Sequence, residues 1–161
     1  MYITGAKWNR TVTAAEVTAG ASPEFAVGTI GMDYNGKAYK YVQYDTGAGS
    51  VAGTAGNVAY YYAPSGTSAG STTVVTSDLS DSAGLGAGVL VAAMGDGDYG
   101  WVQVRGPATL TTALTAGADG NALTAVGATD GTLDVSALVT DSIVAYAVDA
   151  SAKIVMCNFP M

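Results

Sequence analysis

Residues 33–44 read DYNGKAYKYVQY, and this stretch decides the fold class of the chain. Asn35-Gly36 lies between two β-rich runs, residues 25–32 and 38–44, and Asn-Gly in that position is the strongest short signal for a β-hairpin. A two-residue type I′ turn suits this pair, since both of its central residues need positive φ. The return run alternates, with Tyr39, Tyr41 and Gln43 on one face and Lys40, Val42 and Tyr44 on the other. We therefore expect an antiparallel hairpin here.

Short β-rich runs separated by Gly, Asp, Ser and Pro continue to the end of the chain. Further strands are expected at 57–62, 72–77, 88–94, 99–105, 108–114, 121–126, 132–135, 142–148 and 153–159. No segment sustains a period of 3.6 residues over three turns, which is the pattern of an amphipathic helix. The sequence predicts an all-β fold, a compact barrel or sandwich of short antiparallel strands.

The length of 161 residues suits one domain with an attached segment. Residues 1–24 lack alternation and are expected to form an N-terminal arm or edge segment, followed by a β-domain over 25–161. Residues 13–17 could make one helical turn, which Ser22-Pro23 would close. Trp8 within the arm has two interpretations. It contacts a partner, or it covers the core of its own domain.

Two halves of the β-domain show similar elements. Tyr41-Val42-Gln43 in residues 38–98 corresponds to Trp101-Val102-Gln103 in residues 99–159, and similar Gly-Asn and valine-rich elements follow each of them. These elements predict two related β-units with loops of different lengths. Chance similarity is the competing explanation, because the chain contains 29 Ala, 22 Gly and 19 Thr.

The composition limits the classes of partner. The formal net charge is −7, and only six residues are basic, so the general field of the chain disfavours nucleic acid and anionic membranes. A local basic spot remains near Lys7 and Arg10. No apolar run approaches the roughly 18 residues that span a bilayer. The N-terminus lacks the pattern of a secretory signal, so synthesis in a cytoplasm is expected.

Catalytic machinery is not expected. The chain has no histidine, the commonest general base, so its serines and Cys157 lack the usual activating partner. Four lysines, at positions 7, 37, 40 and 153, are expected to face solvent or lie at strand edges. Four aspartates, at positions 96, 98, 119 and 130, adjoin glycine, as in Asp119-Gly120 and Asp130-Gly131, and this pairing is typical of turns. We expect neither an enzyme nor a cofactor.

Two groups of side chains remain as candidate sites. Asp96 and Asp98 place two carboxylates in a glycine-rich loop, which Ca²⁺ could accept, although a hairpin loop explains them equally well. Tyr60-Tyr61-Tyr62 predicts an interface, with residues 60 and 62 on one face of a strand and residue 61 on the other. Carbohydrate stacking is the alternative role for these tyrosines. The full set of interface candidates is Lys7, Trp8, Arg10, Tyr60, Tyr61 and Tyr62.

Residues 98–109, DYGWVQVRGPAT, carry a resemblance to a known group of proteins. This element, with residues 26–30 and 35–43, resembles small virion proteins of tailed bacteriophages that are described as capsid decoration, cement or head-stabilising proteins. The resemblance spans about residues 25–159. It implies a barrel-like protein, often a homotrimer, bound to the major capsid protein on the outer surface of the virion, made in the bacterial host cytoplasm, with no catalytic residues. A carbohydrate- or surface-binding β-module of a phage fibre or adhesin is the alternative.

Overall fold

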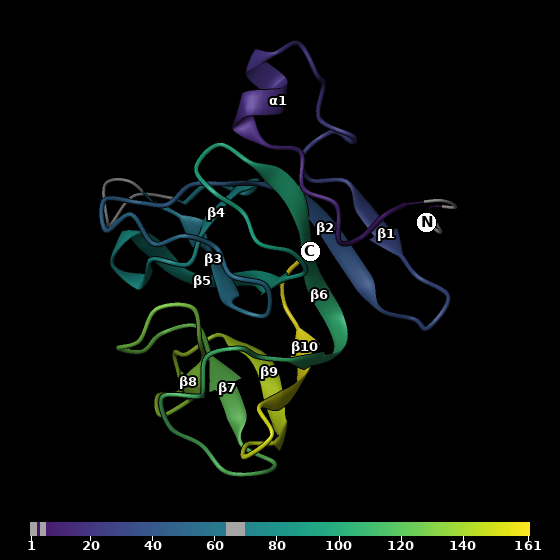
Figure 1. Cartoon of the computed structure of the whole chain (residues 1–161). Coiled ribbons are helices and arrows are strands. Elements are labelled where there is room, and N and C mark those ends of the chain that lie inside the picture. The colour runs from purple at the N-terminus through teal and green to yellow at the C-terminus, as the bar shows by residue number, and fades with distance from the viewer. Residues whose placement is uncertain (1–2, 4–5, 64–69) are drawn as a thin grey trace.

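The computed structural model describes residue 3 and residues 6–63 and 70–161, and within them the fold is all-β (Figure 1). The strands are β1 (Ile30–Met32), β2 (Ala38–Tyr44), β3 (Val58–Tyr62), β4 (Val74–Thr76), β5 (Ser82–Leu90), β6 (Tyr99–Thr109), β7 (Ala122–Thr124), β8 (Asp134–Val135), β9 (Ile143–Asp149) and β10 (Ile154–Asn158). A short helix, α1 (Ala14–Thr18), and a 3₁₀ turn, η1 (Leu79–Asp81), complete them.

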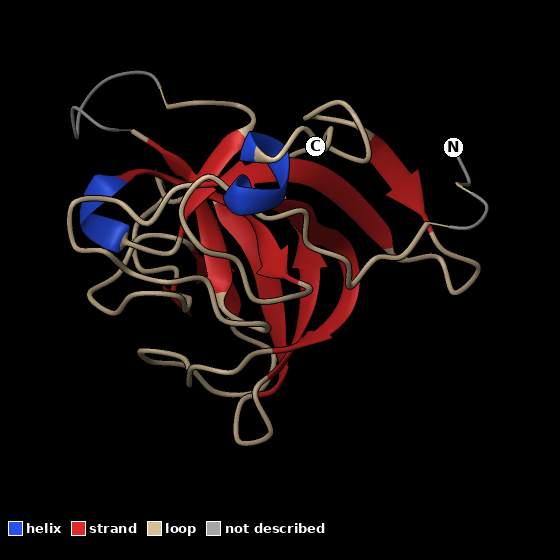
Figure 2. Ribbon diagram, turned by 45° about the horizontal axis from the view of Figure 1, so that its top comes forward, coloured by secondary structure: helices blue, strands red, loops and turns tan. Residues whose placement is uncertain are grey.

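Five strands close into a small barrel. The order is β2-β4-β3-β5-β6, and β6 pairs again with β2 to complete the ring, whose strands curve around one another in Figure 2. The neighbours are antiparallel except for β2 and β4, which run parallel at Gln43 and Tyr44. The barrel agrees with one of the two predicted architectures, while this parallel pair departs from the expected antiparallel pattern.

β6 joins the barrel to a second sheet. With 11 residues it is the longest strand, and its first half pairs with β2 and β5. Its second half, from Arg105 to Thr109, pairs with β10, and the sheet continues through β9 and β7 to β8. The predicted aromatic-Val-Gln elements meet at the first half, where Tyr41 of β2 lies opposite Trp101 of β6. Pairing between the two elements does not show that the two halves of the domain are related, so the internal duplication stays a prediction.

Two apolar clusters hold the elements together. The larger one runs through the barrel and into the second sheet, and its fully buried side chains include Tyr44, Tyr60, Leu123 and Val155. The smaller one contains Tyr39, Tyr41 and Trp101, which lie on the opposite face of β2 and β6 and are covered by Ile3, Trp8 and Phe25. Because successive side chains of β2 point to opposite faces, the strand contributes to both apolar clusters.

The hairpin that connects β1 and β2 is antiparallel, as the sequence predicts, but its turn is different. Only Gly36 has positive φ, at 79°, so the type I′ turn is wrong. The Asp33 carboxylate accepts hydrogen bonds from the backbone N–H groups of Asn35 and Lys37, both at 2.9 Å. This Asx-type bonding stabilises a longer turn in which only the glycine needs the left-handed conformation.

The N-terminal segment contains the helical turn that the sequence suggested at residues 13–17. Thr13 and Glu16 form a reciprocal capping box that begins α1, and the backbone N–H of Ala14 donates to Asp98 at 2.8 Å. Val12 forms an isolated antiparallel bridge with Tyr99 at the start of β6. Local capping thus stabilises the helical turn, which ends at Thr18, before Ser22-Pro23.

Two strand boundaries also differ from prediction. β5 begins at Ser82 rather than at 88, and the segment expected as a strand at 108–114 ends with β6 at Thr109. The glycines of β5 obscured the first boundary, because glycine-rich sequence is typical of bends. Gly86 instead allows close packing, since a Cβ atom there would lie 2.7 Å from the ring of Phe159. No helix in the described residues is long and apolar enough to span a membrane.

Candidate functional site

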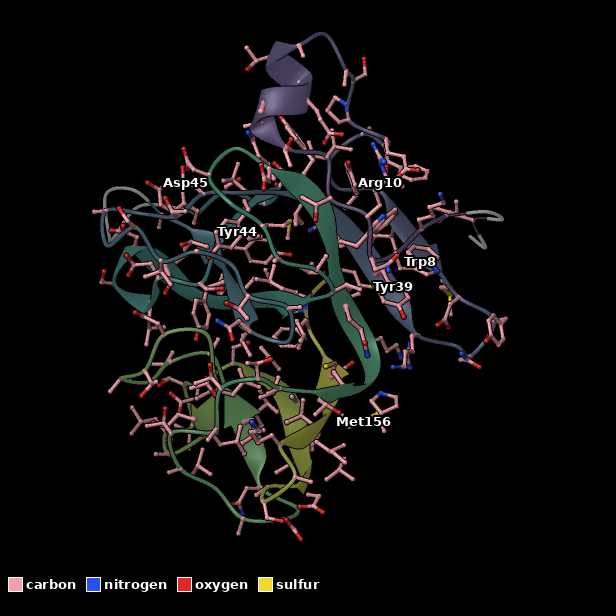
Figure 3. All side chains as sticks on the ribbon, viewed as in Figure 1. Trp8, Arg10, Tyr39, Tyr44, Asp45 and Met156 are labelled. Carbon is pink, nitrogen blue, oxygen red and sulfur yellow. The ribbon has the colours of Figure 1, made fainter. Side chains whose placement is uncertain are left out.

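Trp8 attaches the N-terminal segment to the outside of the barrel. Its ring stacks on Tyr39, with 4.5 Å between centroids, and meets Trp101 edge-on at 4.8 Å (Figure 3). Phe25 adds an edge contact to Trp101 at 5.1 Å. Gly31 provides the space, because a Cβ atom at this position would lie 2.7 Å from the indole of Trp8. Of the two predicted roles for Trp8, the structure places it over the aromatic core of its own chain.

The two basic candidates beside Trp8 are exposed. Lys7 faces solvent, and the guanidinium of Arg10 lies 3.7 Å from the carboxylate of Glu16 in an exposed ion pair. Surface pairs of this kind contribute little to stability. Both side chains are therefore accessible to a partner, although part of the positive charge predicted at this spot is balanced by Glu16.

Most of the tyrosine run is buried. Tyr60 has no exposed surface, and its hydroxyl donates to the backbone carbonyl of Thr132 and accepts from the backbone N–H of the same residue. Tyr61 is 7% exposed, and only Tyr62 is partly open to solvent. Tyr60 is thus excluded as an interface residue, and the three side chains do not form the exposed platform that carbohydrate stacking requires. The loop at Thr132 packs against Tyr60 and buries that face of β3. Alternation groups the side chains by face, but it does not say which face another segment covers.

The aspartates of the glycine-rich loop are used as turn and cap residues. Both carboxylate oxygens of Asp98 accept backbone hydrogen bonds, one from Ala14 and one from Gly95 at 2.7 Å. Asp96 is exposed and accepts a longer bond, 3.3 Å, from the N–H of Thr46. In the described residues no three acidic, cysteine or histidine side chains gather where a metal ion could be held. The bond from Gly95 is the predicted turn contact, whereas the bonds from Ala14 and Thr46 join the loop to distant segments of the chain.

Cys157 lies on the buried face of β10. Burial is the largest influence on its thiol and raises the pKa to about 12, so the reactive thiolate is scarce at neutral pH. Its place in the core agrees with a side chain that packs and does not react.

The outer face of the second sheet carries large apolar side chains. Pro107 of β6, Met156 of β10 and Tyr146 of β9 lie opposite one another in register, and we call these three residues the β10 stripe. Tyr146 is 48% exposed and Met156 is 44% exposed, and Met156 lies near the bend of β6 in Figure 3. Contiguous exposed apolar surface of this kind marks sites of protein interaction. The alternation of β9 and β10 contains this signal, because Tyr146 and Met156 fall on the face opposite Ala145, Ala147 and Cys157.

Sequence reasoning missed a buried lysine. Lys40 is expected at the surface, yet only 6% of it is exposed, and its ammonium donates to the Tyr61 hydroxyl at 2.9 Å. The ammonium also lies 4.9 Å from the centre of the Tyr61 ring. A signal was available, because alternation places Lys40 on the same face of β2 as Val42 and Tyr44, both completely buried.

A small pocket opens beside this lysine. It has a volume of about 220 Å³, and its walls come from β2, β3, β5, the segment that leads into β4, and the residues after β10. We call it the Lys40 pocket, and the residues that define it are Lys40, Tyr61, Ser71, Leu85, Pro160 and Met161.

Comparison with known proteins found no match. No family model, no curated protein and no solved structure is significantly similar to this chain.

Proposed function

We propose that this chain is a structural virion protein that binds the outer surface of a tailed-phage capsid and stabilises the shell. The observation that carries the proposal is the β10 stripe, an exposed apolar surface presented by a sheet whose other face is a packed core. Exposed apolar surface costs solubility unless a partner covers it, so its presence favours a role in protein contact.

The sequence element that resembles decoration proteins supports the same proposal. Residues 99–109 of that element form β6, which connects the barrel to the second sheet and contributes Pro107 to the stripe. The element therefore determines both the framework of the molecule and part of its exposed apolar surface.

A protein of this kind stabilises the shell by binding alone and needs no catalytic activity. A ligand that binds only the assembled, expanded shell stabilises that shell by mass action, and many identical sites multiply the effect. The net charge of −7 would keep free copies from associating nonspecifically before they dock. The major capsid protein is the proposed partner, and the virion is the proposed location.

The test uses expanded capsids of the parent phage that lack this protein. Purified chain should sediment with the capsids and raise the temperature at which they release DNA. The double variant Tyr146→Lys, Met156→Lys should lose binding, whereas Tyr34→Lys should retain it, since Tyr34 is 92% exposed and lies outside the stripe. Thermal melts of both variants verify that they fold. Failure of the wild-type chain to bind or protect the capsids rejects the proposal.

We further propose that the chain acts as a homotrimer. Each copy would then offer the capsid several identical contacts, and the avidity would exceed that of one copy. Analytical ultracentrifugation of the free chain, with the stripe variant in parallel, measures the mass and shows whether the stripe serves self-association or docking. A free chain that is monomeric at all concentrations, and monomeric on the capsid, would contradict the trimer.

A further inference from the structure

The loop between β8 and β9 ends in an exposed apolar tip. We call residues 137–140, Ala-Leu-Val-Thr, the β9 tip. Leu138 is 66% exposed, and Val139 is fully exposed. The Asp141 carboxylate accepts hydrogen bonds from the backbone N–H groups of Ala137 and Leu138, both at 2.9 Å, and the N–H of Asp141 donates to the carbonyl of Leu138 at 3.1 Å. These bonds close a turn that presents two large apolar side chains to solvent.

A pocket lies along β6, where this strand passes from the barrel to the second sheet. Its volume is about 550 Å³. We call it the β6 pocket, and the residues that define it are Lys37, Tyr39, Val91, Gln103, Pro107 and Ile154. Most of its lining is apolar or aromatic, as is usual for binding pockets. The volume lies within the roughly 300–1,000 Å³ of sites that enclose a small molecule, so the pocket has room for two apolar side chains.

The tip and the pocket belong to parts of the chain with opposite charge. Residues 110–152, which include β7, β8, β9 and the tip, contain five aspartates and no lysine or arginine. None of the residues that line the β6 pocket is acidic, and Lys37 is one of them. Arg105 is exposed on the same face of β6 as Gln103 and Pro107. Among the described residues, neither Lys37 nor Arg105 forms an ion pair, so both cations are available to an acidic partner.

The tip and the pocket of one copy lie at opposite ends of the second sheet. The sheet order is β6-β10-β9-β7-β8, so the pocket adjoins the first strand and the tip follows the last one (Figure 1). A contact between these two surfaces therefore joins two copies head to tail, and contacts of this type generate closed rings. A symmetric tip-to-tip contact would bring two acidic surfaces together, which costs free energy.

We propose that the β9 tip of one copy docks in the β6 pocket of a second copy. Leu138 and Val139 enter the pocket, while Lys37 and Arg105 face the acidic segment around the tip. This inference deepens the proposed homotrimer and rests on it, since it names the two surfaces through which the copies meet. Tyr146 and Met156 of the β10 stripe do not line the pocket, so they remain for the capsid.

The first test measures self-association of the free chain by sedimentation velocity over a range of concentrations. Leu138→Asp should raise the dissociation constant about tenfold or more, because it brings a charge into an apolar contact. Leu85→Asp is the matched control, since Leu85 is also an exposed leucine but lies on β5, outside the tip and the pocket. Thermal melts verify that both variants fold. A trimer that Leu138→Asp leaves unchanged, or that both variants weaken equally, overturns the contact.

The second test identifies the two surfaces by cross-linking. Cys157 is the sole cysteine of the chain and is buried, so added thiols react without competition. The double variant Val139→Cys, Thr109→Cys places one thiol on the tip and one at the pocket, which Thr109 also lines. A short bismaleimide should link its copies into dimers and closed trimers, whereas Val139→Cys, Leu85→Cys should stay monomeric on a denaturing gel. Dimers of Val139→Cys alone, or a trimer whose double variant does not cross-link, overturn the proposal.

The outcomes separate this inference from the proposed function. A trimer that does not respond to Leu138→Asp leaves the homotrimer intact and rejects the tip contact. A chain that is monomeric at all concentrations rejects both the homotrimer and the contact, while sedimentation with capsids still decides the capsid proposal. Self-association that depends on Leu138, in a chain that never binds capsids, supports the contact and rejects the capsid.

Discussion

At the scale of single residues, Lys40 shows a side chain whose burial opposes stability. Its side chain is 6% exposed, and among the described residues its ammonium has one hydrogen-bond partner, the neutral hydroxyl of Tyr61. Replacing buried charges by apolar groups of similar volume is often neutral or stabilising. We therefore expect Lys40→Met to unfold at the same urea concentration as wild type, or at a higher one. Destabilisation by more than about 1 kcal/mol, at the low end of the usual effect of core mutations, would show that Lys40 has a structural role.

Tyr60 illustrates the opposite case. Its buried hydroxyl both donates to and accepts from the backbone of Thr132, which joins β3 of the barrel to the loop before β8. Tyr60→Phe removes both bonds and leaves a buried N–H and C=O without their partner, so unfolding should become easier by about 1–3 kcal/mol. Urea denaturation measures the difference, with Tyr34→Phe as the exposed control. An unchanged midpoint for Tyr60→Phe would mean that water replaces the hydroxyl.

At the scale of elements, the N-terminal segment depends on one aromatic contact more than on its helix. α1 has five residues and none of them is buried, so it cannot be stable by itself. Trp8→Ala should destabilise the chain by about 2–3 kcal/mol, less than the ~3–5 kcal/mol of a fully buried tryptophan. Thr13→Ala, which removes the cap of α1, should cost about 1 kcal/mol or less. Urea denaturation measures both effects. A larger loss of stability for Thr13→Ala than for Trp8→Ala would show that the helix, and not Trp8, holds the N-terminal segment on the barrel.

At the scale of the whole molecule, the tyrosine-rich cores predict alkaline unfolding. Burial, followed by the charge of Asp33, raises the pKa of Tyr39 to about 12, and burial raises the pKa of Tyr60 in the same direction. These groups keep their protons in the folded state at a pH where the unfolded chain has lost them, since an unperturbed tyrosine titrates near 10. Their contribution to stability is complete below pH 10 and is lost as the pH rises toward 12.

Thermal melts across the pH range measure this effect. With no histidine in the chain, the melting temperature should stay nearly constant between about pH 6 and 8. It should then fall steeply above about pH 10. Tyr60→Phe should reduce the steepness of that fall, because it removes one of the shifted groups. A melting temperature that is constant up to pH 12 would contradict the raised pKa values of Tyr39 and Tyr60.

Much of the fold can be predicted from local patterns, and less of the site can. The alternation of residues 38–44 and the Asn35-Gly36 pair are local signals, and both predicted the hairpin, although the Asx bonding of Asp33 changed its turn. The exposed apolar side chains of β9 and β10 were also within reach of alternation. The buried state of Tyr60 was not, because it depends on Thr132, which is 72 residues away in the chain.

The amino-acid sequence by itself determined the all-β class, because that class depends on a period of two residues. It also determined the net negative charge and the absence of histidine, because both depend on composition alone. Closure of the barrel, the direction of β4 beside β2 and the burial of Tyr60 were decided only by tertiary structure. The physical reason is that alternation assigns a side chain to one of two faces but does not say what packs against either face. In this protein both faces of β2 are covered, one by the barrel core and one by Trp8 and Phe25.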